Sequence, residues 1–210
     1  GYSIWTKMKA IYPFVGGTAS THKWNLINPL DTNAAFRLVF NGGWTHDSLG
    51  IKMNNTNTYA ETFVTSTNGN DRAISAYLTQ RIDGSVNVVL GAWNSGMIGI
   101  RAGNSNDTFH NNSGTTGKTI TPTTIDPFLG NSRTATNSWF AQNGNNIFTN
   151  YTDASPAVTR TLQIGTFNGT TWRGNHQVGF VHISTSLTQS EMTDLRTAVN
   201  TFQTTLSRQV

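Results

Sequence analysis

Short runs of alternating apolar and polar residues recur along this 210-residue chain. The clearest runs are residues 34–40, 73–79, 86–90 and 97–100. Alternation with a period of two is typical of β-strands that bury one face, and short strands at such intervals are typical of sandwiches and barrels. The pattern therefore predicts an all-β domain.

The segments between and before these runs complete the outline. Residues 2–9 predict a short helical turn, because their apolar residues recur at spacings of three and four. Residues 10–15 predict a strand that Pro13 confines to an edge or a bulge. Residues 103–124 are almost wholly Asn, Ser, Thr and Gly and predict a long exposed loop, after which residues 126–130 resume the sheet.

The end of the chain has a helical period instead. Apolar residues recur there at spacings of three and four, on one helical face: Met192, Leu195, Val199, Phe202 and Leu206. Thr188 followed by Glu191 forms a capping-box pattern. We therefore expect a helix over about residues 188–206 whose apolar stripe packs on the sandwich. A coiled-coil seam is the alternative, although two heptads are short for one.

Before this helix the order of elements is informative. Asn143-Gly144 stands between two alternating segments and predicts a two-residue hairpin, since a type I′ turn needs positive φ at both central positions. A strand ending in Ile164-Gly165 and an apolar strand at 178–183 follow. This order resembles the end of concanavalin A-like, laminin-G-like jelly rolls. The resemblance implies a single jelly-roll sandwich over residues 1–210 with the C-terminal helix packed on it, and a recognition module in preference to an enzyme.

The composition fits strands joined by polar loops. Only 11% of the residues are charged, whereas 24 are Asn and 34 are Thr. Thr suits a pleated surface, and Asn and Gly suit turns. Six Trp, eleven Phe and five Tyr supply enough apolar area for a core, which excludes a disordered chain.

Charge and cysteine content exclude several partners. The formal charge is +4 with no run of Lys or Arg, so the footprint of a nucleic-acid-binding protein is missing. Without cysteine the fold has neither disulfides nor thiolate metal sites, which fits assembly in a reducing cytosol. No apolar stretch is long enough to cross a bilayer, and we expect no membrane insertion.

Three segments carry a more specific resemblance: Ile4-Trp-Thr-Lys-Met-Lys-Ala-Ile-Tyr-Pro-Phe-Val-Gly-Gly17, Ala35-Phe-Arg-Leu-Val-Phe-Asn-Gly-Gly-Trp44 and Phe202-Gln-Thr-Thr-Leu-Ser-Arg-Gln-Val210. Together with His22-Lys-Trp-Asn-Leu26, they resemble a C-terminal concanavalin A-like or laminin-G-like domain of tailed-bacteriophage structural proteins. The resemblance covers residues 4–63 and 125–210. It implies a virion component, in a tail fibre or appendage, assembled in the bacterial cytoplasm. It also implies that Val210 is a natural C-terminus and that the chain is a C-terminal fragment of a longer one, and it transfers no catalytic residues.

Catalysis by paired carboxylates finds little support. Retaining glycosidases of this kind of fold need two carboxylates about 5–5.5 Å apart, commonly from alternate positions of one strand. The chain has only two Glu, at 61 and 191, and no acidic pair at spacing i, i+2. A glycoside hydrolase built from distant acids such as Asp47 and Asp83 stays as a third hypothesis. We expect no catalytic residues.

Metal and phosphate sites are equally weak in the sequence. His22, His46 and Asp47 match no known ligand spacing. Asp107 with Asn104 and Asn106 offers oxygen ligands, but we interpret them as a solvated loop. Residues 114–119 lack the Walker spacing, and His182 on a strand is interpreted as a partly buried, hydrogen-bonded histidine. We expect no metal and no cofactor.

Binding is the chemistry that the sequence does offer. Carbohydrate sites combine an aromatic face with planar hydrogen-bonding side chains. Two turns place such groups together: Trp93 with Asn94, and Asn168 with Trp172 and Arg173. The alternative is that each Trp caps the core or packs at a subunit contact. For Trp5, Trp24, Trp44 and Trp139, which lie in or beside predicted elements, we expect core packing.

The sequence favours two functional hypotheses. The first is a lectin-like adhesion module that binds host surface glycan through a homo-oligomer, a trimer if it belongs to a fibre, so that weak sites gain avidity. The second is an architectural capsid or tail decoration that binds other virion proteins. The orientation of Trp93 and Trp172 discriminates between them, since an open site beside Asn or Arg favours the lectin.

Overall fold

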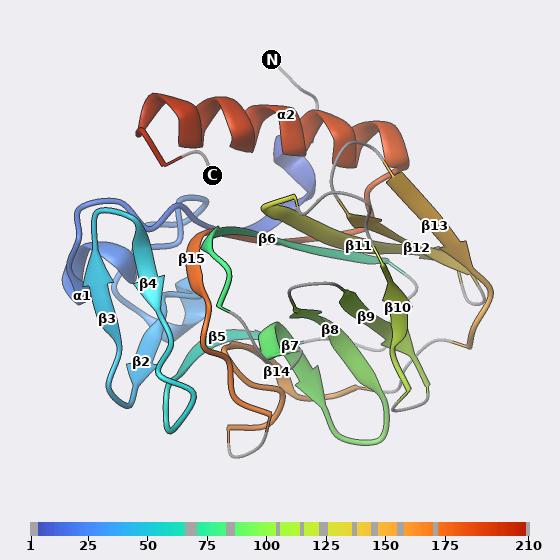
Figure 1. Cartoon of the computed structure of the whole chain (residues 1–210), viewed down its shortest axis with the longest axis horizontal. Helices are drawn as coiled ribbons and strands as arrows, with labels where there is room; N and C mark the ends of the chain where they lie inside the picture. The colour runs from blue at the N-terminus through green and yellow to red at the C-terminus, as the bar shows by residue number, and fades with distance from the viewer. Residues whose placement is uncertain are drawn as a thin grey trace.

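The computed structural model describes residues 4–65, 71–82, 87–103, 106–113, 116–121, 126–135, 138–143, 147–154, 158–169 and 172–208. Two antiparallel sheets face each other, and one long helix covers the outer face of one of them (Figure 1). We call the two the helix-covered sheet and the opposite sheet. This arrangement confirms the predicted all-β jelly-roll sandwich with a C-terminal helix.

The helix-covered sheet has eight strands among the described residues. In spatial order they are β13 (Ile147–Tyr151), β12 (Ser138–Asn143), β11 (Phe128–Ala135), β6 (Arg72–Gln80), β15 (Gln177–Ser184), β4 (Gly50–Lys52) and β3 (Thr45–Asp47), with β1 (Met8–Tyr12) also paired to β15. The opposite sheet has the order β10 (Lys118–Ile120), β9 (Asp107–Asn112), β8 (Met97–Ala102), β7 (Asn87–Trp93), β14 (Thr161–Ile164), β5 (Tyr59–Thr65) and β2 (Val39–Asn41).

The main core lies between the sheets and follows the alternation in the sequence. On β8, Ile98, Ile100 and Ala102 are fully buried in this core, whereas the alternate residues of the strand face outward. Equivalent inward positions on the helix-covered sheet are taken by Ile74 and Leu78 of β6. Each of the Ile and Leu side chains contributes about 1.5–3 kcal/mol by leaving water.

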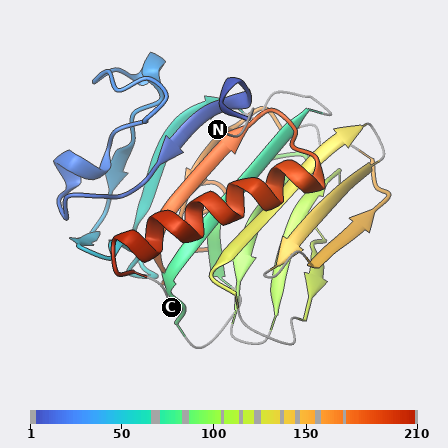
Figure 2. The same ribbon diagram turned by 90° about the horizontal axis from the view of Figure 1, so that it is seen from above.

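Helix α2 (Gln189–Thr205) packs on the outer face of the helix-covered sheet (Figure 2). The predicted capping box is confirmed, with Thr188 and Glu191 each accepting from the other's backbone N–H. Met192, Leu195 and Val199 are buried in a second apolar cluster with residues of the sheet, as the stripe predicts. The stripe fails at its end, where Leu206 lies beyond the helix and is 37% exposed.

Two predicted segments differ from the structure. Residues 34–40 are not one strand, because Thr32 caps a 3-10 turn, η2 (Asn33–Ala35), and Phe36 adopts φ +60°, so that β2 begins only at Val39. Residues 103–124 are not an exposed loop, since β9 and β10 lie there. The polar residues of β9 misled the prediction, because they satisfy their hydrogen bonds inside the protein.

Smaller corrections concern the ends of elements. The N-terminal helical turn is confined to η1 (Trp5–Lys7), because Met8 already pairs with β15. A short helix, α1 (Ala19–His22), lies in a segment where none was predicted. The predicted hairpin joins β12 to β13, but Asn143 is a strand residue opposite Ile147 and not part of a two-residue turn. Gly144 lies outside the described residues.

Candidate functional site

The loop that joins β14 to β15 crosses the outer face of the opposite sheet, on the side away from α2 (Figure 1). The two ends of this loop are joined by a hydrogen bond from Gly174 N–H to Gly165 O at 2.9 Å. Gly165 N–H in turn donates to Val89 O of β7 at 2.9 Å. Gly174 has no room for a side chain, because a Cβ would lie 2.1 Å from Met53 Sδ and 2.3 Å from Val88 O. We call residues 165–174 the Trp172 loop; residues 170 and 171 lie outside the described part.

Phe167 anchors this loop on a floor made of two glycines. Gly91 of β7 and Gly99 of β8 are paired across the two strands. A Cβ on either glycine would lie 2.2 Å from Cε1 of Phe167, so the ring rests directly on the bare backbone. Phe167 is fully buried, and its carbonyl accepts from Trp93 N–H at 3.0 Å. The loop is therefore fixed where it crosses the sheet.

On top of Phe167 the loop presents Trp172 to solvent. The Trp172 ring centroid lies 6.0 Å from that of Phe167 and 6.5 Å from that of Trp93, and Cζ of Arg101 stands 4.4 Å over the Trp172 ring. Trp172 is 43% exposed and has φ +61°, a left-handed conformation that is uncommon for a bulky residue. We call Trp93, Arg101, Phe167 and Trp172 the Trp172 cluster.

The structure brings together only some of the sequence-predicted site residues. Trp93 and Trp172, 79 positions apart, meet as described. Asn94 is exposed at the next turn and donates from Nδ2 to Thr159 Oγ1 at 2.8 Å. Arg173 is directed elsewhere, because it donates to Thr58 O at 3.3 Å and its Cζ lies 5.7 Å from the Tyr59 ring. Asn168 lies in the loop, where its backbone N–H donates to Thr166 Oγ1 at 3.4 Å.

Sequence reasoning missed Arg101 and Phe167. Arg101 stands between the inward-facing Ile100 and Ala102, so strand alternation alone places it on the outer face. Phe167 gave no local signal, because its role depends on the distant glycine pair. Next to it lies His110, 5.3 Å from the Phe167 ring, whose pKa is lowered to about 3 by burial and by Arg101. That histidine is neutral at physiological pH.

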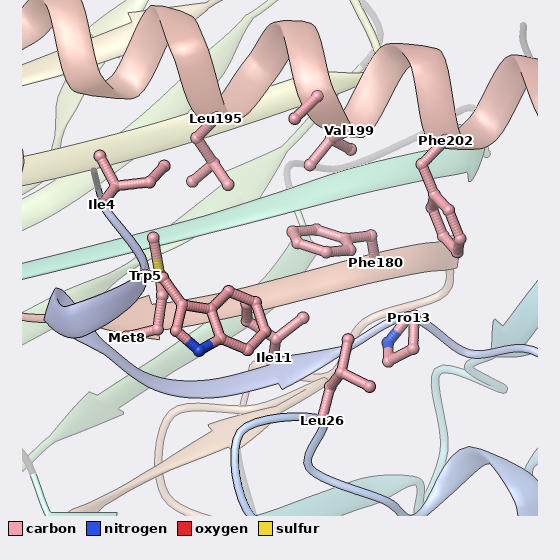
Figure 3. A pocket seen from close by; sticks show the side chains of 11 residues that line it. Ile4, Trp5, Met8, Ile11, Pro13, Leu26, Phe180, Leu195, Val199 and Phe202 are labelled. Carbon is pink, nitrogen blue, oxygen red and sulfur yellow. The ribbon is translucent and has the colours of Figure 1, made fainter. Parts of the chain in front are cut away.

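A second candidate site is an apolar groove on the far side of the sandwich, between α2 and the N-terminal segment (Figure 3). It has a volume of about 400 Å³, and all its lining residues are apolar. Leu195, Val199 and Phe202 of α2 face Trp5, Met8 and Ile11 across it, and Phe180 lies between them. Trp5 and Leu26 at the rim are 56% and 52% exposed. The expectation that Trp5 packs in the core is therefore wrong, since η1 directs Ile4 inward and Trp5 outward.

Core packing is confirmed for Trp139 and in part for Trp44, whereas Trp24 belongs to none of the apolar clusters among the described residues. Trp139 is 1% exposed and donates from Nε1 to Asp153 Oδ2 at 3.3 Å. Trp44 is half-buried against Phe40 and donates to Tyr59 O at 3.3 Å. Trp24 is half-buried, with Lys23 Nζ 4.6 Å from its ring centroid.

The weak metal candidates form hydrogen bonds within the protein. His22 and His46 do meet, with 3.1 Å between their Nδ1 atoms, and His22 Nε2 accepts from Gly17 N–H. That acceptance leaves the proton of neutral His22 on Nδ1, donating to His46. Asp107 is fully buried and forms an ion pair with Arg81 at 2.6 Å, which corrects its interpretation as a solvated loop residue. Among the described residues no group of three or more His, Cys, Asp and Glu could hold a metal ion.

The predicted hydrogen bond of His182 is confirmed, since its Nδ1 lies 2.9 Å from Ser75 Oγ, but the side chain is fully buried where partial burial was expected. In the part of the chain that the structure describes, no helix combines the length and apolar character that crossing a membrane requires.

No protein-family model matches this sequence, and no curated protein matches it. Solved structures do resemble the fold. One is domain 4 of AbnA, a GH43 extracellular arabinanase from Geobacillus stearothermophilus, in complex with arabinotriose, with a TM-score of 0.59, 13% identity, and coverage of 90% of this chain and 98% of that one.

Two toxin domains are similar to the same degree. The botulinum neurotoxin serotype D binding domain has a TM-score of 0.61 at 8% identity over 94% of this chain. The binding domain of Paraclostridial Mosquitocidal Protein 1 has a TM-score of 0.59 at 10% identity over 95%. This chain spans about half of each toxin chain, 53% in both cases. At these identities the likeness establishes the jelly-roll fold.

Proposed function

We propose that this chain is a non-catalytic, carbohydrate-binding module and that the glycan lies on the Trp172 cluster. The observation that carries the proposal is the half-exposed Trp172 ring, held by a fixed loop beside Trp93 and Arg101. Sugar rings present flat C–H faces that stack on such aromatics, and their hydroxyls need planar polar partners. The fold is also that of an arabinanase domain solved with arabinotriose.

The roles of the carboxylates favour binding over hydrolysis. Apart from Asp194, each described Asp or Glu takes part in a hydrogen bond or an ion pair within the protein: Asp31, Asp47, Glu61, Asp71, Asp107, Asp126, Asp153 and Glu191. Asp83, the proposed partner of Asp47 in a hydrolase, lies outside the described residues. A glycosidase needs a proton donor and a nucleophile or base that are available to substrate.

The setting of this module is part of the same proposal. The resemblance of residues 4–63 and 125–210 to bacteriophage structural proteins supports a virion domain, in a tail fibre or appendage, that contacts host surface glycan. In a fibre the domain would be trimeric, and three weak sites on one particle would bind with useful avidity. That the chain is one domain from the C-terminal part of a longer protein remains a prediction.

A bacterial glycan array tests the binding function. The protein, in its own oligomeric state, is applied together with the variants Trp172→Ala and Trp93→Ala. Trp5→Ala is the matched control, because it removes another exposed indole, from the opposite side of the sandwich. We expect the first two variants to lose binding and the control to retain it, with all circular dichroism spectra unchanged. No binding at millimolar site concentrations, or binding that survives Trp172→Ala, would contradict the proposal.

The apolar groove favours a second candidate function, an architectural contact within the virion. Exposed Trp5 and Leu26 at its rim form the kind of surface that proteins bury against one another. The homo-oligomer predicted from the sequence makes another copy of this chain the first partner to test. Light scattering on the double variant Trp5→Ser, Leu26→Ser is expected to show a smaller particle than the parent. An unchanged mass would remove the groove from the assembly.

A further inference from the structure

We propose that the glycan recognised by the Trp172 cluster is anionic and that Arg101 binds its carboxylate or phosphate. This inference rests on the proposed carbohydrate-binding function and names the substrate class of that same site.

The segments that build this surface are almost free of acidic residues. Residues 87–121 and 154–175 include β7 to β10 and the Trp172 loop, and their sequence contains a single carboxylate, Asp107. That carboxylate is fully buried and paired with Arg81, so it presents no negative charge to a ligand. These segments therefore add no exposed negative charge to the face that an anion approaches.

The same segments contain four cationic side chains: Arg101, Lys118, Arg160 and Arg173. Lys118 is paired with Asp153 at 3.5 Å, and the other three cations are arginines. Arg101 contacts Trp172 itself, Arg173 follows Trp172 in the chain and is directed toward Tyr59, and exposed Arg160 follows the Thr159 that Asn94 contacts. They give this end of the opposite sheet a positive potential, which attracts an anionic ligand and raises its rate of association.

Two further titratable groups lie on this face. Glu61 of β5 accepts from the neutral amide Gln163 Nε2 at 2.7 Å and keeps its negative charge, but the pairing of Gln163 with Gly91 places it two strands from the glycine floor, and it is one carboxylate against three arginines. His110 is neutral, because burial lowers its pKa to about 3. The balance of charge at the Trp172 cluster therefore remains positive at physiological pH.

Arg101 is the residue best placed to bind the anion. Its Cζ stands 4.4 Å over the Trp172 ring, so the guanidinium is in direct cation–π contact with the indole. A guanidinium carries five N–H donors in a planar fork, the geometry that recognises a carboxylate or phosphate in a bidentate way. A sugar that stacks on Trp172 therefore brings its acidic substituent close to Arg101. Lys has no such planar fork, which makes Arg101→Lys an informative substitution.

The test compares charged and neutral forms of one glycan by titration calorimetry on the intact chain. A uronic-acid oligosaccharide is paired with its carboxyl-reduced form, and a phosphate-bearing oligosaccharide with its dephosphorylated form. The variants are Arg101→Gln, Arg101→Lys and Trp172→Ala. The control is Lys52→Gln, which removes a cation from β4 of the helix-covered sheet, where it contacts Gln80. Thermal unfolding followed by circular dichroism verifies that each variant is folded.

We expect an anionic form to bind about tenfold or more tightly than its neutral counterpart, because hydrogen bonds to charged groups are the stronger ones. Arg101→Gln should abolish that preference, so that the charged and neutral forms bind equally whatever their common affinity; Arg101→Lys should restore part of the preference, and Lys52→Gln should leave it intact. The preferred pair identifies carboxylate or phosphate as the source. Equal binding of charged and neutral forms, lost in Trp172→Ala, would overturn the inference and leave the glycan site standing. No binding of any form would overturn both.

Discussion

The two outer faces of the sandwich are covered in different ways. Helix α2 covers one face with 17 residues of regular structure, its own capping box and a stripe of buried apolar side chains. The Trp172 loop covers part of the other with irregular chain, held by Phe167 on two glycines. The helix buries a broad area and leaves an apolar groove beside it, whereas the loop buries one ring and exposes another next to Arg101. The comparison indicates that one cover mainly stabilises the sheet and the other mainly displays side chains.

The largest expected effect on stability comes from removing a buried side chain of the helix. Met192 is fully buried between α2 and the helix-covered sheet. Met192→Ala should lower the free energy of unfolding by about 2–5 kcal/mol, through lost burial and a residual cavity. Urea unfolding measures the change. Glycan affinity of the folded variant should equal that of the parent; weaker binding would mean that the two covers are coupled through the sandwich.

The next largest effect is expected at the glycine floor. In Gly99→Ala the new Cβ would lie 2.2 Å from the Phe167 ring and 2.8 Å from Leu90 O, so the ring must move away from the sheet. We expect a loss of about 1–3 kcal/mol in the free energy of unfolding, together with weaker glycan binding, because Trp172 rests on Phe167. Chemical denaturation and the glycan titration measure the two effects.

Gly130→Ala is the matched control for this substitution, on the face under α2. Its Cβ would lie 3.1 Å from Met192 Sδ, the end of a flexible side chain that can yield. The loss of stability should be smaller than for Gly99→Ala, and binding should not change. If Gly130→Ala weakened binding as much as Gly99→Ala, the special role assigned to the glycine floor would be wrong.

The two covers also differ in how far the sequence predicts them. The helix is a local pattern: Met192, Leu195 and Val199 lie on one face and Thr188 caps it, so residue spacing was sufficient. Trp93 and Trp172 could be selected as aromatics at turns, but their meeting depends on the pairing of β7 with β8 and β14. Phe167 and Arg101 were missed because their partners are far away in sequence. The polar strand β9 was missed for the same reason. Asn111 can be buried because distant residues, Arg72 and Asn131, satisfy its side-chain hydrogen bonds.

A pH titration examines one buried histidine on each face. Burial lowers the pKa of His182, under α2, and of His110, beside Phe167, to about 3 from an ordinary 6.5. Because the folded pKa lies below the unfolded one, unfolding takes up a proton. This contribution to stability is complete above about pH 6.5 and is lost as the pH falls toward 3, by about 1.4 kcal/mol per pH unit for each histidine.

The variants His182→Asn and His110→Phe should each take up one proton fewer on unfolding than the parent. The slope of the unfolding free energy against pH should therefore be smaller in each variant. Urea unfolding at pH 7, 6 and 5 measures the slope for the parent and both variants. At pH 7 we expect His110→Phe to be tolerated, since neither ring nitrogen of His110 has a hydrogen-bond partner among the described residues. His182→Asn should be less well tolerated, because the bond to Ser75 must be rebuilt. A slope unchanged in either variant would mean that its histidine is already protonated or exposed in the fold.

The smallest effect is expected at the cap of α2. Thr188→Ala removes the oxygen that accepts from Glu191 N–H and should lower the free energy of unfolding by about 1 kcal/mol. Glu191 also bonds Thr188 N–H and pairs with Lys7 at 2.6 Å, so it links the helix start to the segment that ends in β1. The double variant Thr188→Ala, Glu191→Gln should therefore be less stable than Thr188→Ala alone, while glycan binding on the opposite sheet stays unchanged. The position of the Trp172 loop depends instead on tertiary contacts with Gly91, Gly99 and Met53. A loss of binding in the cap variants would show that the loop also depends on the helix, and the division between a stabilising and a displaying cover would fail.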